Sequence, residues 1–316
     1  MLRRPPETLD EFRGLFSESG DPRQWPHVAS ALTYRRAIRE LAGLLRCEPD
    51  ERAVFERRLA TDPDEYAARC LRASGTEWLL VDDGFPPSEV GHDWRRMGEL
   101  AACAARPVLR LETRGADASA AVERARADGF VALKTIAAYR GGLDRVSDHV
   151  VTALEANEAT GDPLPVQVHC GFGDSDLHLW RSDPTYLKPL LERFPTTPFV
   201  LLHCYPYVRE AGWLAHVYAN VSFDLSLTIP HVARPAEALW EALELAPLSK
   251  LLYASDAARA PELYFVAARW WREALAEVLA EALPADEAEE AGRAILRTNA
   301  LRLYRLGAEP PAFRSG

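Results

Sequence analysis

The sequence has few cysteines, and they are not grouped. Its 316 residues include five cysteines and no Cys-x-x-Cys pair. An odd number of widely spaced cysteines argues against a disulfide framework and predicts free thiols, as in the reducing cytoplasm. The five positions are Cys47, Cys70, Cys103, Cys170 and Cys204.

Long apolar runs are also missing. No stretch reaches the ~18 consecutive apolar residues that a membrane-spanning helix needs. Met1 to Arg4 is followed by Pro5, Pro6 and polar residues, so the apolar core of a secretory signal is absent. These absences predict a cytoplasmic protein without a membrane segment.

Positive charge is scarcer than negative charge. The 37 Lys and Arg residues are outnumbered by 47 Asp and Glu residues, which gives a formal net charge of -10. Because phosphate-binding surfaces need clustered Lys and Arg, this balance argues against nucleic acids and anionic membranes as partners. We expect a small-molecule substrate instead, with a second copy of the chain as the candidate protein partner.

The sequence does contain a regular alternation of strand-like and helical segments. The first 70 residues have helical patterns; for example, Ile38, Leu41 and Leu45 lie at helical spacing. After residue 76, seven short apolar runs predict strands, and helical stretches separate most of them. The expected strands are 78–81, 108–111, 130–134, 166–169, 199–203, 221–225 and 251–254. The expected helices between them are 94–105, 118–127, 146–156, 184–193, 209–219 and 236–245.

This alternation predicts parallel strands joined by crossover helices. The comparable strand residues Leu133, Val168 and Leu202 lie 35 and 34 positions apart, near the roughly 30 residues per unit of a (β/α)8 barrel. An open doubly wound sheet is the alternative, but its Gly-x-Gly-x-x-Gly turn is missing. We predict one α/β barrel domain over 1–316, with helices over 1–75, alternation over 76–260 and C-terminal helices over 261–316.

Polar residues recur at the ends of the predicted strands. Side chains alternate along a strand, so sequence parity identifies those that face the barrel interior. By this parity Lys134, His169, His203 and Asp224 face inward, and Asp256 follows the last strand on the same side. Because barrel active sites form at the carboxyl ends of the strands, these five residues are expected to converge there.

The residue types of this group suit a metal ion. Burying several ionisable groups together is costly unless they pair or bind a cation. Two neutral imidazoles and a carboxylate are good ligands for a divalent metal such as zinc, manganese or iron. The metal would activate a water, and a nearby carboxylate would act as general base. Simpler interpretations are structural histidines, a helix cap at Asp256 and a Lys134 that extends to solvent.

Other residues near the strand ends allow two interpretations each. Arg140 and Arg209 come just after strand ends, where a guanidinium could clamp a substrate carboxylate. A surface salt bridge is the alternative for both. Cys170 and Cys204 directly follow the two histidines, but their parity turns them outward. This favours burial as small apolar residues over nucleophilic work.

Three stretches that contain these residues resemble the amidohydrolase-related family. They are VQVHCGFGDSDL (166–177), LLHCYPYVREA (201–211) and LYASDA (252–257). Together with residues 130–143, 220–226 and 261–263, they resemble more narrowly the branch that occurs alone or fused to a glutamine-synthetase domain. The resemblance covers roughly residues 30 to 305.

The resemblance implies a TIM barrel with a mononuclear or binuclear metal centre that hydrolyses a C–N amide-type bond. At the matching positions, it implies that His169 is a metal ligand and that His203 is a second ligand or a substrate contact. It implies that Asp256 binds the metal and takes the proton from the attacking water. Lys134 matches a lysine that related enzymes sometimes carry as a carbamylated bridging ligand.

One family feature is missing. The family begins with a strand that ends in His-x-His and supplies two metal ligands, and this sequence contains no such pair. The only histidine before residue 90 is His27, which no predicted strand precedes. Two explanations stay open: the true start lies upstream, or this member has lost its first strand. Both predict a barrel without strand 1.

Three functions follow as hypotheses. The first is metal-dependent hydrolysis of an amide-type bond in a small carboxylate-bearing substrate; only the association with glutamine-synthetase domains suggests a glutamyl amide. The second is non-oxidative decarboxylation, which related barrels carry out with a similar metal site. The third is a non-catalytic barrel that binds a ligand or partner, which the missing His pair favours.

Overall fold

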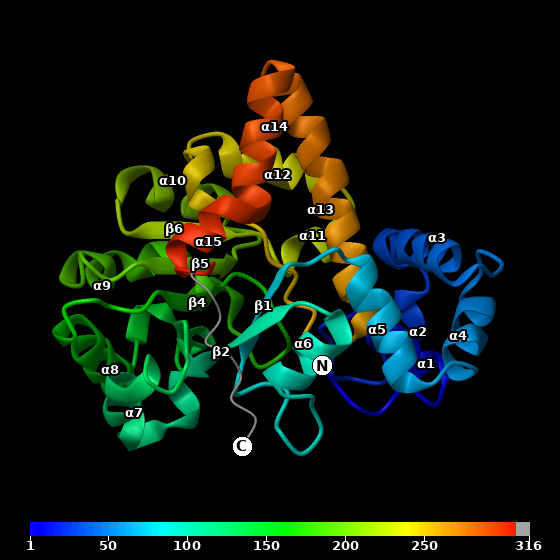
Figure 1. Ribbon diagram of the computed structural model, residues 1–316, viewed down its shortest axis with the longest axis horizontal. Helices are drawn as coiled ribbons and strands as arrows, with labels where there is room; N and C mark the ends of the chain where they lie inside the picture. Colours follow the sequence, from blue (N-terminus) through cyan, green and yellow to red (C-terminus); the bar gives the residue numbers. More distant parts are fainter. Residues whose placement is uncertain (308–316) are drawn as a thin grey trace.

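A single parallel sheet forms the centre of the molecule (Figure 1). The computed structural model describes residues 1–307. Within them seven strands lie in sequence order, each parallel to the next. This order belongs to a barrel, because an open doubly wound sheet reverses its strand order at a switch point. The strands are β1 (Trp78–Asp82), β2 (Ala104–Arg110), β3 (Ala132–Thr135), β4 (Val166–Cys170), β5 (Phe199–His203), β6 (Val221–Asp224) and β7 (Leu251–Leu252).

The strands confirm the expected seven, with shifted ends. β2 begins four residues before its expected start, because helix α6 (Trp94–Ala101) ends early. Ala102 has a left-handed backbone with a φ of 53°, which terminates the helix. β7 is only two residues long, so Asp256 lies in the loop beyond it and not on the strand.

The two outer strands leave a gap in the barrel wall. Within residues 1–307, β1 pairs only with β2 and β7 pairs only with β6. Residues 75–82 along β1 and residues 252–259 after β7 line one cavity without interruption. Only alternate side chains of a strand face a barrel interior, so this uninterrupted lining means that the backbone edges themselves face the cavity. The fold is therefore a TIM barrel that lacks one strand, as expected.

Crossover helices cover the outer face of the sheet (Figure 1). Val166 and Val168 of β4 point outward and pack in one core cluster with Val150 and Leu154, which belong to the helix that connects β3 to β4. Each such fully buried side chain contributes roughly 1.5–3 kcal/mol. These helices are α7 (Ala118–Ala125), α8 (Asp148–Ala159), α9 (Lys188–Arg193), α10 (Val208–Val217), α11 (Thr228–His231) and α12 (Pro235–Leu243).

Five helices precede the sheet and form a layer beside it (Figure 1). The side chains of Thr8, Asp50 and Asp62 cap three of them by accepting hydrogen bonds from backbone N–H groups of the first turn. The sequence therefore marks these helix starts locally. The helices are α1 (Leu9–Gly14), α2 (Trp25–Val28), α3 (Leu32–Leu45), α4 (Glu51–Leu59) and α5 (Pro63–Ala73).

The chain returns to the barrel through α13 (Pro261–Ala282), α14 (Ala285–Arg293), a π-helical turn and α15 (Asn299–Leu303). Trp270 and Trp271 of α13 are fully buried, so this helix is well packed against the rest of the fold. Tyr304 packs among inward-facing residues of the strands, and the Gln167 Nε2 donates to its hydroxyl at 3.0 Å. No helix within residues 1–307 has the length and apolarity to cross a membrane.

The five cysteines are all free thiols in the structure. Cys170 and Cys204 are fully buried, and their sulfur atoms lie against carbonyl oxygens of their own strands. Burial raises the pKa of both thiols well above the ordinary value. The prediction that these two residues pack as small apolar side chains is confirmed.

A buried ion pair joins the helical layer to α13. Arg58 Nε and Glu262 Oε1 are 2.5 Å apart, and the two side chains are 7% and 0% exposed. We expect Glu262→Ala to lower the free energy of unfolding by about 3–5 kcal/mol, because it leaves the Arg58 charge buried and unpaired. Urea denaturation measures this loss. The double variant R58M/E262L removes both charges and is expected to recover most of it; an equal loss in both variants would contradict the interpretation.

Candidate active site

A cavity of about 660 Å³ reaches the carboxyl ends of the strands. All five residues that parity predicted to converge there line it, and so does Arg140. These residues are Lys134, Arg140, His169, His203, Asp224 and Asp256. Four of them lie on strands, Arg140 follows β3 and Asp256 follows β7. The sheet thus assembles residues that lie up to 122 positions apart in the sequence, from 134 to 256.

His203 is held in one tautomer by a relay of hydrogen bonds. The Ser226 hydroxyl donates to Asp224 Oδ1 at 2.6 Å, and it lies 2.7 Å from His203 Nδ1. Since a hydroxyl has one proton, it must accept from an Nδ1–H. The other ring nitrogen, Nε2, is therefore unprotonated, and it is buried without a hydrogen-bond partner. This nitrogen therefore directs a free electron pair into the cavity.

His169 provides a second imidazole of the same kind. Its Nε2 is also buried without a partner. Its ring lies between those of Tyr139 and His203, with centroid separations of 4.7 and 4.5 Å. Burial, reinforced by the positive charge of Lys134, lowers the pKa of both histidines well below the ordinary value. Both imidazoles are therefore neutral near pH 7, as metal ligands must be.

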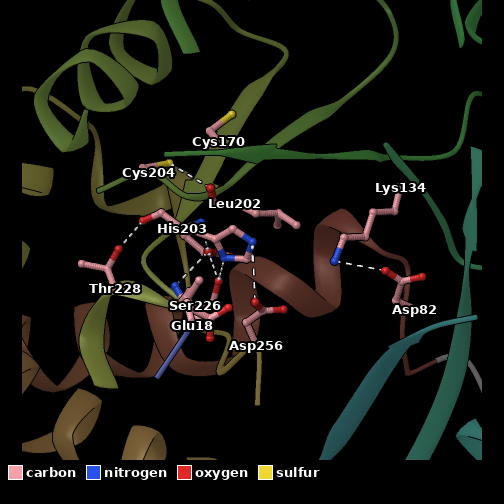
Figure 2. Close-up of polar contacts among 12 residues, drawn as sticks. Glu18, Asp82, Lys134, Cys170, Leu202, His203, Cys204, Ser226, Thr228 and Asp256 are labelled. Carbon is pink, nitrogen blue, oxygen red and sulfur yellow. Dashed lines mark hydrogen bonds and ion pairs between the residues drawn. The ribbon is translucent and has the colours of Figure 1, made fainter. Parts of the chain in front are cut away.

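Asp256 stands beside these rings on a strained backbone. Its Oδ2 lies 3.7 Å from His203 Nε2 (Figure 2). His203, Cys204 and Asp256 have φ values of 68°, 68° and 47°, a left-handed conformation that is costly outside glycine. Helix α13 begins at Pro261 with Ala260 as its cap, so the helix-cap interpretation of Asp256 is wrong. Strain of this kind concentrates at functional sites.

These donors fit a divalent metal, although they do not form a complete cage. Two ligand atoms about 2.05 Å from a tetrahedral zinc are about 3.3 Å apart, close to the 3.7 Å between His203 and Asp256. However, no three His, Cys, Asp or Glu side chains within residues 1–307 are grouped tightly enough to hold a metal. The two unpartnered imidazole nitrogens nevertheless favour a bound ligand, because buried polar atoms without partners are costly unless a ligand satisfies them.

Lys134 does not fit the predicted role of metal ligand. Its Nζ lies 3.2 Å from Asp82 Oδ2 (Figure 2). Arg110 Nε also contacts both oxygens of Asp82 at 3.0 Å. Burial alone would raise the pKa of Asp82, but Lys134 and Arg110 lower it overall. In the structure Lys134 is thus the ion-pair partner of Asp82, a different role from that of the predicted metal ligand.

Asp224 also has a different role from the predicted substrate contact. Its Oδ1 accepts hydrogen bonds from the backbone N–H of His203, and from the N–H and hydroxyl of Ser226. The side chain is 3% exposed, and burial raises its pKa to about 6. Asp224 therefore orients His203 through Ser226, and the substrate-contact prediction is corrected to a positioning role.

The two arginines predicted as substrate contacts lie in different environments in the structure. Arg140 lines the cavity, and its Nη1 donates to the carbonyl of Tyr139 at 3.2 Å. Arg209 lies on α10, where its guanidinium faces Glu241 and Glu244 at 3.6 Å. Arg209 is not among the cavity-lining residues, so the salt-bridge interpretation holds for it and we do not propose it as a substrate contact.

Sequence reasoning missed several residues of the site. Glu18 enters the cavity from the helical layer, and Asp82 enters from β1. Asp82 could have been found, because it directly follows the predicted strand 78–81 and has the same parity as the inward-facing Leu80. Glu18 has no such signal, since it lies in a loop more than 150 residues from the histidines.

The fold and the site together define an α/β barrel whose polar residues gather at the carboxyl ends of the strands, where the active sites of barrel enzymes form. The Amidohydrolase family model matches residues 93–306. The chain therefore belongs to the amidohydrolase family.

Relatives agree with this assignment. The chain is 30% identical to protein fluG of Emericella nidulans, in an alignment that covers 90% of the chain and 42% of fluG. The chain thus spans less than half of that relative. An inferred metal-dependent hydrolase from Lactobacillus casei has 27% identity and a TM-score of 0.84, covering 96% of this chain and 92% of its own.

A more distant structure shares the fold alone. A uronate isomerase from Bacillus halodurans has 13% identity and a TM-score of 0.63, covering 96% of this chain and 85% of its own. Barrels of this shape therefore carry more than one activity. Family membership and the Lactobacillus casei relative indicate an enzyme of the hydrolase type, but the bond and substrate have to be argued from the site.

Proposed function

We propose that the chain is a metal-dependent hydrolase that cleaves a C–N amide-type bond in a small, carboxylate-bearing substrate. The observation that carries this proposal is the pair of buried, unpartnered Nε2 atoms of His169 and His203 beside Asp256. Neutral imidazoles and a carboxylate favour zinc, with manganese and iron as alternatives. The cavity is large enough for a small substrate.

Each residue has a distinct part in this proposal. His169 and His203 would hold the metal, with Asp256 as a third ligand and general base. A bound divalent metal supplies Lewis acidity and a water of lowered pKa. Asp224 and Ser226 keep the His203 ring oriented, and Asp256 would take a proton at Oδ2, which lies 3.7 Å from His203 Nε2. The Asp82 ion pair keeps the neighbouring wall of the cavity polar.

An amide panel tests this function. The protein is supplied with zinc or manganese and offered side-chain amides of amino acids, N-acyl amino acids and simple amides, and the released amine is measured. We expect hydrolysis that His203→Gln abolishes. His216→Gln is the matched control, because His216 is exposed on α10. Release of carbon dioxide without amine would instead show a decarboxylase.

A non-catalytic ligand-binding barrel is the second candidate. It is favoured by the lack of a three-residue metal cluster within residues 1–307. It predicts less than about a tenth of an equivalent of metal after purification from zinc- or manganese-supplemented medium, and no turnover of any amide. Stoichiometric metal together with turnover would exclude it.

Gly173 keeps the space in which Tyr139 packs on His169. A Cβ at position 173 would lie 1.7 Å from the Tyr139 hydroxyl oxygen and 3.4 Å from His169 Nε2. We expect Gly173→Ala to displace Tyr139 and to lower kcat/KM by about 100-fold, because small displacements of positioning groups are that costly. Steady-state kinetics measure the loss. Gly43→Ala is the control, since its Cβ meets no atom within 4 Å; equal kinetics for both variants would contradict the role of Tyr139.

A further inference from the structure

Two oppositely charged side chains face the cavity without a part in the proposed chemistry. Glu18 lies in the loop after α1, and Arg259 lies three residues beyond Asp256. Glu18 Oε2 and Arg259 Nη2 are 3.5 Å apart, and the side chains are 23% and 28% exposed. This separation is too long for a good hydrogen bond. Their donor and acceptor atoms therefore remain available to a ligand.

Both residues are held in place by their backbones. On the Glu18 side, the Trp25 indole N–H donates to the carbonyl of Ser19 at 3.0 Å. On the other side, the Arg259 carbonyl accepts from the N–H of Leu2 at 3.3 Å. The two charges are therefore presented by fixed loops, one from the helical layer and one from the barrel. Figure 2 shows Glu18 near Ser226 and Asp256.

The charged side chains around Glu18 could accommodate a bound cation as well as a bound anion. Glu18 faces the carboxyl groups of Asp174 and Asp256 in addition to Arg259. The pKa of Glu18 is raised to about 7, mainly by burial and also by the two aspartates, while Arg259 acts to lower it. Three carboxyl groups thus face one guanidinium. An ammonium beside Glu18 and a carboxylate on Arg259 would improve this balance.

We propose that Arg259 and Glu18 bind the carboxylate and the ammonium of an α-amino acid. In an amino acid the nitrogen and the carboxyl carbon are about 2.5 Å apart, which matches two side chains whose charged atoms are 3.5 Å apart. Because both charged groups are then free, the bond that is cleaved lies in the side chain of the substrate. The substrate class is a side-chain amide of an α-amino acid, and this part rests on the proposed hydrolase function.

Calorimetry on metal-free protein tests recognition without turnover. The probes are L-glutamine, 4-aminobutanamide, which lacks the carboxylate, and glutaramic acid, which lacks the ammonium. We expect wild-type protein to bind L-glutamine at least about 10-fold more tightly than either analogue, because each analogue lacks one of the two charged groups that form hydrogen bonds with Arg259 or Glu18. Arg259→Gln should weaken the two carboxylate-bearing probes only, and Glu18→Gln the two ammonium-bearing probes only.

The control and the overturning results are specific. Arg209→Gln is the matched control, because Arg209 lies outside the cavity lining. Equal binding of all three probes to wild-type protein would overturn the proposal. It would also be overturned if Arg140→Gln abolished the preference for carboxylate-bearing probes while Arg259→Gln left that preference unchanged. If the expected pattern appears but no amide is hydrolysed, the proposed hydrolysis fails and the recognition stands. If amides are hydrolysed without this pattern, the recognition alone fails.

Discussion

Asp256→Asn is expected to lower kcat/KM for the amide that is hydrolysed best by at least about 1,000-fold. General-base catalysis typically contributes 10²–10⁴-fold, and the amide of Asn is also a poorer metal ligand than a carboxylate. Steady-state kinetics with saturating metal give the number. The change removes the proton acceptor and leaves the shape of the side chain intact.

The fold should tolerate this substitution. Asp256 has a φ of 47°, and Asn is among the residues that adopt the left-handed region most readily. Thermal unfolding should therefore change by no more than a few degrees. Asp176→Asn is the matched control, because Asp176 is an exposed aspartate that lines the same cavity. Unchanged turnover in Asp256→Asn, or an equal loss in the control, would refute the role of Asp256.

An added strand that ends in His-x-His is expected to raise zinc affinity by more than about 100-fold. The gap between β1 and β7 exposes two backbone edges to the cavity, and an added strand would pair with them at the usual spacing of about 4.7–4.9 Å. Met1 also lines this cavity, so a segment of about seven residues joined ahead of it can reach the gap. Groups that only hydrogen-bond to metal ligands typically change metal affinity by about 10–100-fold. Two added imidazole ligands should change the zinc affinity at least as strongly.

A matched extension separates the effect of filling the gap in the sheet from the effect of adding two imidazole ligands. The same segment ending in Gln-x-Gln would fill the gap and protect the β1 and β7 edges from hydrogen exchange, but it would add no imidazole. We expect both extensions to raise Tm and only the histidine version to raise zinc affinity. Equal affinity for both would show that the added ligands do not reach the site, and unchanged exchange would show that the gap is not a strand position.

The sequence predicted the strands well because their signal is local. Short apolar runs identified all seven strands, and period-two parity identified inward-facing residues such as His169. His203 differs, because by parity it shares a face with Leu201, which packs on the outer side of β5. His203 lines the cavity with a left-handed φ of 68° at the end of the strand. Strand ends were less well predicted. Helix α6 ends early because Ala102 adopts a left-handed conformation. The sequence did not predict this end, because glycine, the residue that most readily adopts this conformation, is absent at that position.

The roles of the site residues were harder to predict than their positions. Lys134 and Asp224 were placed correctly in the interior but given the wrong partners. An ion pair with Asp82 and a hydrogen bond with Ser226 depend on contacts between different strands. Parity gives the direction of a side chain but not its neighbour. Glu18 could not be found at all, because only the packing of the helical layer against the barrel brings it into the cavity.

Anomalous X-ray scattering from crystals grown with zinc tests the central claim most directly. If His169 and His203 form a metal site, data above and below the zinc edge will show a peak about 2.0–2.1 Å from both Nε2 atoms. Asp256 will be within coordinating distance of the same peak, and His203→Gln will remove it. A cavity without a zinc peak near either histidine, at saturating zinc, would contradict the account.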